Sequence, residues 1–270
     1  MTDIHLCQPD TTKSCAACCG IYNYVDNTRE ALLQRFLFRT RLFARVRENR
    51  MSLEDYREVI RHRENAKRIY TTIYTCEFVG FLDEACLRVG CMLHPLSNDG
   101  NDMRTISFYG RDICDGHFCP SYQKLANHEV RILLAALDDW YLYGAVITDI
   151  DYVKTFFHII QNRVGETLDA GKVENRPALL ETVRRYCGLK TAWPFRDTMR
   201  PRFGKYYFVG EEYDIARIDY GALGAEPSPY DAIFASLSSH FQNKDELDRA
   251  NLVVHDLIGE FCSAYTDADR

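Results

Sequence analysis

Cysteine is the residue whose number and spacing in this chain point to chemistry. Nine of the eleven cysteines fall within residues 1–120, and only Cys187 and Cys262 lie beyond them, each in an apolar, helix-like stretch. Thiols in a reducing compartment stay free, and an odd number of them argues further against a disulfide framework. Clustered free thiols are typical of metal ligands, whereas isolated ones pack as small hydrophobic residues. We therefore predict a metal centre in the first 120 residues, and packed thiols at Cys187 and Cys262.

The first cluster has the order Cys7-x7-Cys15-x2-Cys18-Cys19-Gly20. A C-x2-C spacing lets two thiolates approach one ion from a tight turn. The side chains of adjacent residues diverge, so Cys18 and Cys19 are expected to serve two centres, or a metal and a redox partner.

The second cluster contains Cys76, then Cys91 in a Cys-Met-Leu-His-Pro segment, then Cys114-x4-Cys119. Cys86 lies between them in the segment FLDEACLRVG, whose helix-like pattern favours a packed thiol rather than a ligand. Without Cys86, this cluster supplies the ligands that the first cluster lacks.

Eight cysteines remain as candidate metal ligands. They are Cys7, Cys15, Cys18, Cys19, Cys76, Cys91, Cys114 and Cys119. Eight thiolates are enough for two four-thiolate sites, or for a four-iron cluster and a zinc ion. The alternative is one zinc with four ligands and four ordinary buried thiols. His94 and His117 can each replace a thiolate, although a histidine beside a ligand more often has a supporting role.

A family resemblance follows from these motifs. The C-x2-C-C-G segment, the later C-x-L-H-P segment and the closing pair of cysteines are similar to bacterial cysteine-cluster proteins of the zinc- or iron-chelating (YkgJ) type. They are more distantly similar to the cysteine-rich part of flagellin lysine methylases. The resemblance covers the first 125 residues apart from 28–74, and the stretch between Cys91 and Cys114 is longer than in the family. It implies metal ligands at Cys15, Cys18, Cys19, Cys91, Cys114 and Cys119.

Three classes of function fit these residues. The first is a metal-binding protein, redox or structural, that holds an iron–sulfur cluster of the 4Fe-4S kind, zinc, or both. The second is a metal-dependent enzyme for methyl transfer or redox chemistry, which the methylase resemblance implies. No familiar catalytic motif occurs, so no residue receives a catalytic role. The third is a thiol redox switch in which Cys18 and Cys19, or Cys114 and Cys119, form disulfides.

The fold expected around these cysteines is mainly α, with irregular, metal-nucleated segments and a small β-hairpin. Apolar periodicity and capping residues predict helices over 28–50, 52–74, 121–143, 148–164 and 176–187, one starting at Ser228, and one over 243–265. Their predicted N-terminal caps are Asn27, Ser52, Thr148, Ser228 and Asn243. The segment KYYFVGEEYDIARIDY predicts a hairpin near 205–220 that turns near Gly210.

Two regions are expected. Residues 1–125 form a cysteine-rich metal-binding region into which a helical hairpin, about 28–74, is inserted. Residues 126–270 form a helical region. Neither cysteine block has enough apolar residues for a core of its own, so we expect the hairpin to bring the two blocks together.

Charge and hydropathy limit the partners. Residues 28–70 contain twelve arginines or lysines and six acids, in a chain of net charge −6. Such a basic segment can contact nucleic acid, but basic residues interleaved with acids are more typical of a solvated helix face. The chain lacks a run of about 18 apolar residues, and its N-terminus does not resemble a signal peptide. We expect a cytoplasmic protein that makes no membrane contact and whose partners are open.

Overall fold

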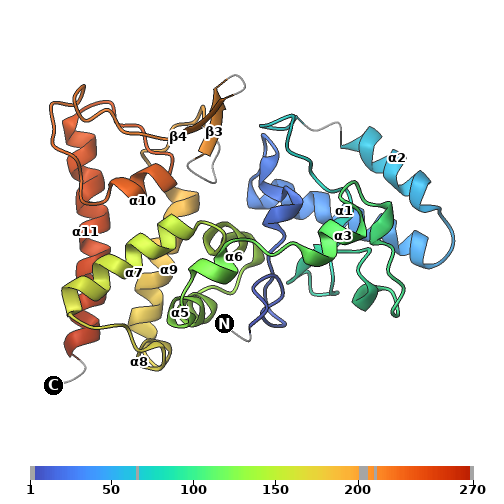
Figure 1. Ribbon diagram of the computed structural model, residues 1–270, viewed down its shortest axis with the longest axis horizontal. Coiled ribbons are helices and arrows are strands. Elements are labelled where there is room, and N and C mark those ends of the chain that lie inside the picture. The colour runs from blue at the N-terminus through green and yellow to red at the C-terminus, as the bar shows by residue number, and fades with distance from the viewer. Residues whose placement is uncertain (1–3, 65–66, 201–205, 210–211, 268–270) are drawn as a thin grey trace. The chain divides into compact units, whose positions relative to one another are not determined.

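The computed structural model describes residues 4–64, 67–200, 206–209 and 212–267 (Figure 1). It divides into two compact units. Residues Ile4–Cys119 and Asp139–Gly144 form the cysteine-rich unit, and Pro120–Asp138 together with the chain from Ala145 onward form the helical unit. The prediction of a mainly helical protein is confirmed.

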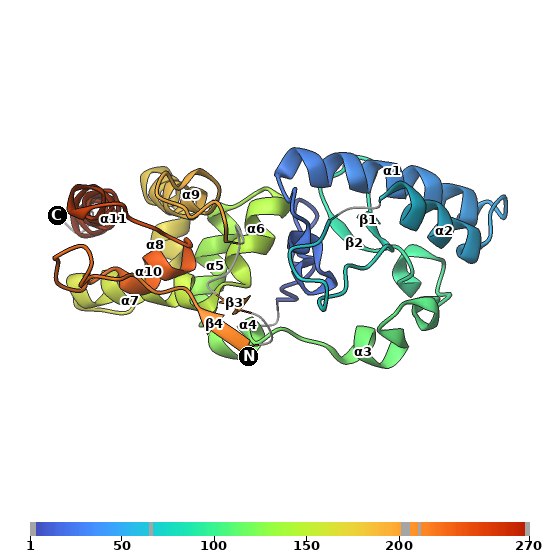
Figure 2. The same cartoon turned by 90° about the horizontal axis from the view of Figure 1, so that it is seen from above.

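The cysteine-rich unit contains two long helices and a small sheet (Figures 1 and 2). Its helices and strands are α1 (Arg29–Arg47), α2 (Leu53–Arg63), α3 (Gly110–Gly116), β1 (Val79–Phe81) and β2 (Val89–Cys91), with 3-10 helices η1 (Ala17–Cys19), η2 (Ile21–Asn23), η3 (Pro95–Ser97) and η4 (Arg104–Ile106). The strands pair antiparallel with Gly80 opposite Gly90, and α1 packs against β1 and α2. This sheet was not expected from the sequence.

The two helices of the predicted hairpin begin close to where the sequence places them. The Ser52 side chain accepts a hydrogen bond from the N–H of Asp55, as predicted. Thr28, not Asn27, caps α1, because Asn27 turns inward and donates its amide to the carbonyl of Tyr22. The prediction that the second helix reaches residue 74 was wrong, since α2 ends at Arg63.

Aromatic side chains form the core of the cysteine-rich unit. The Phe36 ring lies 5.5 Å from that of Trp140, and the Tyr56 ring stacks on Phe78 at 5.4 Å. All four side chains are at most 2% exposed. Burial of each such ring contributes about 1.5–3 kcal/mol, so the segment around Trp140 is part of this core although it lies far along the chain.

The helical unit is built on three packed helices. Its elements are α4 (Ser121–Lys124), α5 (Asn127–Ala136), α7 (Ile150–Val164), α8 (Ala170–Glu174), α9 (Pro177–Ala192), β3 (Tyr206–Val209), β4 (Glu212–Ile215), α10 (Asp231–Ser236) and α11 (Lys244–Thr266), and α6 (Trp140–Ile147) begins in the cysteine-rich unit. Helix α11 packs against α9 and α7, as Figures 1 and 2 show. The predicted cap Asn243 accepts a hydrogen bond from the N–H of Glu246.

The predicted hairpin is present, since β3 pairs antiparallel with β4 and Tyr206 lies opposite Ile215. Its turn near Gly210 lies outside the described residues. Within the described part of the chain, no helix is both long and apolar enough to cross a membrane.

Several predicted boundaries in the second half were wrong. Helix α9 runs to Ala192, whereas the sequence predicted an end at residue 187. The helix expected over 121–143 is divided into α4, α5 and the start of α6, because the Asp139 carboxylate accepts from the N–H groups of Tyr141 and Leu142 and begins a new helix. Asp149, not Thr148, caps α7. Ser228 accepts from the N–H of Tyr230 in a turn that precedes α10, so it does not cap that helix.

Candidate metal centre

Backbone hydrogen bonds join the two cysteine blocks of the cysteine-rich unit. The N–H of Cys15 donates to the carbonyl of Cys7, and the N–H of Cys76 donates to the carbonyl of Cys19, both at 2.9 Å. The buried Ser14 hydroxyl accepts from the N–H of Val89 at 2.6 Å and donates to its carbonyl at 2.8 Å. The first block is therefore fixed to β2.

The turn after the first block requires glycine. Gly20 ends η1 with φ of +79°, and a Cβ at this position would lie 2.3 Å from the carbonyl oxygen of Tyr74. Such a contact is far inside van der Waals distance, and the backbone conformation itself is strained for other residues. Glycine therefore permits the close approach of Cys19 to the segment that carries Cys76.

Four of the predicted ligands form one electrostatic group, which we call the first thiol set. It consists of Cys7, Cys15, Cys18 and Cys119. Burial raises the pKa of the Cys15 thiol well above its usual value, and charge on Cys7, Cys18 or Cys119 raises it further. The Sγ atom of Cys15 also lies 3.6 Å from where a Cβ on Gly144 would stand.

The other four predicted ligands form the second thiol set. It consists of Cys19, Cys76, Cys91 and Cys114. Burial raises the pKa of Cys76 to about 12 and that of Cys91 to about 11. Charge on Cys91 raises the pKa of Cys76, and charge on Cys114 raises that of Cys91.

Cys18 and Cys19 connect the two sets. A hydrogen bond between their side chains lowers the pKa of Cys18, which is solvent-exposed, and raises that of Cys19, which burial raises further. Cys19 is in turn affected by charge on Cys76 and Cys91. The adjacent cysteines therefore link the two sets through their own hydrogen bond.

The three cysteines set aside in the sequence lie apart from both sets. The prediction of a packed thiol in a helix-like segment was wrong for Cys86, which lies in the turn between β1 and β2 with φ of +58° and is only partly buried. Its thiol contacts the carbonyl of Glu84 at 3.7 Å, and its pKa is raised by burial and then by Asp83. Cys187 and Cys262 belong to the helical unit. Cys187 is 1% exposed, as expected of a packed thiol.

The two histidines near the cysteines have different surroundings. His94 caps η3, because its Nδ1 accepts from the N–H of Leu96 at 3.2 Å, and burial lowers its pKa. His117 is exposed at the end of α3.

Several neighbours of the thiols were not foreseen from the sequence. The Ser107 hydroxyl lies 3.5 Å from the Sγ of Cys114. Burial raises the pKa of the Tyr109 phenol, and charge on Cys19, Cys76, Cys18 and Cys114 raises it further. Only contacts made by folding identify these two residues, since neither belongs to a cysteine motif.

The thiols are neighbours without forming a closed coordination sphere. Across the residues that the structure describes, no three His, Cys, Asp or Glu side chains converge closely enough to hold a metal ion. The donor set itself suits metals, because soft thiolates favour zinc and iron–sulfur clusters. Comparison with protein-family models, with curated proteins and with solved structures gives no match to this chain. Any assignment of function therefore depends on the residues described above.

Proposed function

We propose that the cysteine-rich unit is a metal-binding module that holds zinc, an iron–sulfur cluster, or both, through the two thiol sets. The observation that carries this proposal is the approach of the two cysteine blocks, in which the N–H of Cys76 donates to the carbonyl of Cys19 at 2.9 Å. Cys86 of the same unit lies apart, in the turn between β1 and β2. The resemblance to the zinc- or iron-chelating family points in the same direction.

The grouping favours two centres over one. Four thiolates complete one tetrahedral zinc site or one four-iron cluster, and each set contains four. Cys18 and Cys19 interact with each other, and each also interacts with the cysteines of a different set. Two four-thiolate zinc sites, or one cluster and one zinc, satisfy every thiol.

The raised thiol pKa values are consistent with such a role. Burial keeps Cys15 and Cys76 protonated near neutral pH when no metal is bound. A metal ion replaces those protons and compensates the charge of neighbouring thiolates, which would otherwise repel one another in a buried site.

The test is metal and sulfide analysis of protein purified without oxygen. We expect about two zinc ions per chain, or iron with acid-labile sulfide and a brown colour, in proportion to the number of sites. Cys15→Ser is expected to lose the metal of the first set, and Cys76→Ser that of the second.

Cys86→Ser is the matched control, because it removes a thiol of the same unit that belongs to neither set. It should retain the full metal content. The proposal fails if the purified protein holds no metal and takes up none on reconstitution, or if Cys86→Ser and Cys76→Ser lose metal equally. A content of one zinc per chain, with four of the eight thiols reacting as free cysteine, would show that the unit has one metal site and not two.

A thiol redox switch is the second candidate, and one observation favours it. Cys18 is exposed, and its hydrogen bond to Cys19 lowers its pKa, which increases the fraction of reactive thiolate. Mild peroxide would then oxidise Cys18 before the buried Cys76. Mass spectrometry of alkylated protein distinguishes the two roles, because metal ligands are protected from alkylation until a chelator is added.

A further inference from the structure

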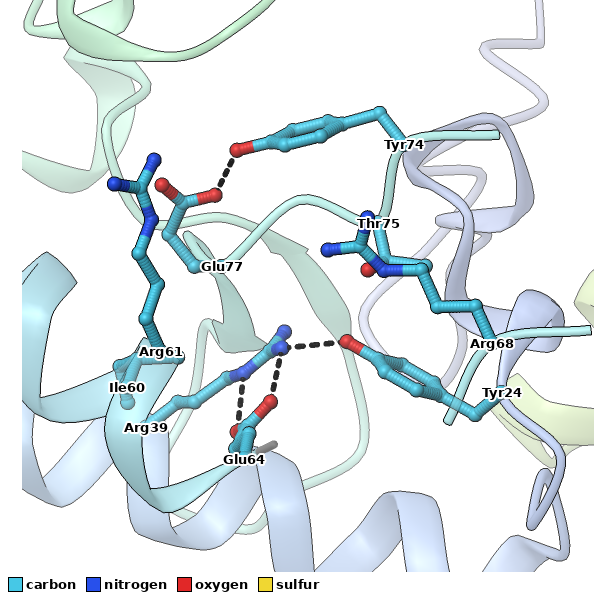
Figure 3. Close-up of a pocket in the computed structure, with 9 residues that line it drawn as sticks. All are labelled: Tyr24, Arg39, Ile60, Arg61, Glu64, Arg68, Tyr74, Thr75 and Glu77. Carbon is cyan, nitrogen blue, oxygen red and sulfur yellow. Dashed lines mark hydrogen bonds and ion pairs between the residues drawn. The ribbon is translucent and has the colours of Figure 1, made fainter. Parts of the chain in front are cut away.

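A small cavity lies in the cysteine-rich unit, beside the second thiol set. Its volume is about 250 Å³ (Figure 3). It is lined by Tyr24, Arg39, Ile60, Arg61, Glu64, Arg68, Tyr74, Thr75 and Glu77. Pockets for drug-sized ligands usually measure about 300–1,000 Å³, so this one suits a smaller molecule.

Both glutamates of the cavity are already neutralised. Glu64 accepts from Nε of Arg39 at 2.8 Å and from Arg35 at the same distance. Glu77 accepts from Nε of Arg57 at 2.8 Å, and the hydroxyl of Tyr74 donates to its other oxygen. Neither carboxylate is left to compensate a further cation.

Two arginines of the cavity remain without an acidic partner. Arg61 on α2 and Arg68 beyond it form no ion pair with any residue that the structure describes, and Arg68 lies 5.8 Å from the Tyr74 ring centre. Figure 3 shows the two side chains on opposite sides of the cavity, with Arg61 on the side of Glu77 and Arg68 on the side of Thr75. The cavity thus carries uncompensated positive charge.

Thr75 adds a hydroxyl group to the lining of the cavity. The residue is only 4% exposed, and its hydroxyl is not one of the sealed polar atoms without a partner, so it is open to the contents of the cavity. It can therefore donate a hydrogen bond to a ligand there.

We propose that this cavity binds a compact dianion of the phosphate or dicarboxylate class, held by Arg61 and Arg68 with a hydrogen bond from Thr75. Planar guanidinium groups match the oxygens of such anions and form charge-assisted hydrogen bonds with them. The volume of about 250 Å³ suits a small anion rather than a nucleic-acid strand, and guanidinium donors do not bind a metal cation.

The bound anion would lie next to the second thiol set. Thr75 immediately precedes Cys76, and Arg39, which lines the cavity, donates from its terminal nitrogen to the carbonyl of Cys76 at 2.9 Å. No cysteine lines the cavity, so this inference stands independently of metal binding.

Isothermal titration with inorganic phosphate, and separately with malonate, tests the inference on the full chain. A background of about 0.15 M sodium chloride screens weak attraction to the exposed basic helices. We expect saturable binding of one anion per chain. Either R61Q or R68Q should weaken it at least about tenfold, because each removes a charge-assisted contact.

R45Q is the matched control, since Arg45 is an exposed arginine of α1 that does not line the cavity. It should bind the anion as the wild type does. The tighter of the two probes identifies the class as phosphate or dicarboxylate. Absence of saturable binding for both probes, or equal weakening by R45Q and R61Q, would overturn the inference.

Discussion

Replacement of Arg39 by leucine should destabilise the cysteine-rich unit severely. Arg39 is 1% exposed, and its guanidinium pairs with Glu64 at 2.6 Å while donating to the carbonyl of Val79 at 3.2 Å and to the Tyr24 hydroxyl at 2.8 Å. It also donates to the carbonyl of Cys76, so one side chain joins α1 to the segment that carries this thiol. Leucine fills part of the space but leaves all four acceptors without this donor.

The magnitude follows from these contacts. Removal of one partner of a buried ion pair costs about 3–5 kcal/mol. Glu64 keeps its ion pair with Arg35, so the cost of losing the ion pair between Arg39 and Glu64 should lie near the lower end of that range. The carbonyls of Cys76 and Val79 add to it, at about 1–3 kcal/mol for each acceptor left unsatisfied and less than additively. We expect a loss of about 4 kcal/mol, a large part of a typical domain stability of roughly 5–15 kcal/mol.

The chain offers a selective assay for this loss. Its two tryptophans fall in different units, Trp140 in the cysteine-rich unit and Trp193 in the helical unit. Urea unfolding followed by fluorescence in a Trp193→Phe background therefore reports on the cysteine-rich unit. Arg41→Leu, an exposed position on the same helix, should change the free energy of unfolding by less than about 0.5 kcal/mol.

A double variant tests the stated cause. Glu64→Leu combined with Arg39→Leu should cost less than the sum of the two single changes, because Arg39→Leu has already removed one of the two arginine partners of the Glu64 carboxylate. A loss below about 1 kcal/mol for Arg39→Leu alone would refute the reasoning, since it would mean that the buried guanidinium and its acceptors are solvated or replaced.

Three further predictions concern other positions. Gly20→Ala should destabilise the cysteine-rich unit by about 2 kcal/mol or more in the same urea assay, because its Cβ would meet the carbonyl of Tyr74 at 2.3 Å; Gly116→Ala, where a Cβ meets nothing within 4 Å, should be tolerated. Cys187→Ser should lower the free energy of unfolding of the helical unit by about 1–3 kcal/mol through a buried hydroxyl, without a change in metal content, and metal loss would contradict its assignment as a packed thiol. Zinc affinity, measured against a competing chelator, should rise from about pH 6 to pH 8. Burial raises the pKa of Cys76 to about 12, and zinc must displace the proton of this thiol when it binds. An affinity that does not change with pH would contradict zinc binding by thiols that are protonated in the metal-free protein.

Features encoded by neighbouring residues could be predicted from the sequence. The caps Ser52 and Asn243 act within three residues of themselves, so the starts of α2 and α11 agree with the structure. The strands β3 and β4 follow from β-branched and aromatic residues that flank a glycine. The helix-like pattern around Cys86 was misleading, because this residue lies in a turn with φ of +58°. The role of the eight other cysteines of residues 1–120 as ligands remains a prediction.

Features that depend on distant contacts could not be predicted. The apolar periodicity of residues 121–143 predicted one continuous helix. In the structure, Asp139 and Trp140 instead belong to the cysteine-rich unit, where Arg29 pairs with Asp139. The end of α2 was missed for a related reason. Ile69 has the pattern of a helix residue, yet its N–H donates to the carbonyl of Asn23, from which it is far removed in sequence.

The irregular segments that carry the thiols owe their order to buried polar side chains as well as to any metal. The Asn23 amide donates to the carbonyls of Tyr70 and Ile73 at 2.9 and 2.8 Å, and its oxygen accepts from the N–H of Tyr70 at 3.0 Å. Ser14 fixes the other end through Val89. None of these bonds involves a thiol, so none of them depends on a metal ligand. The sequence predicted segments nucleated by metal, and these hydrogen bonds add a second source of order; if the thiols bind metal as we propose, such order lowers the conformational entropy lost on binding and so strengthens it.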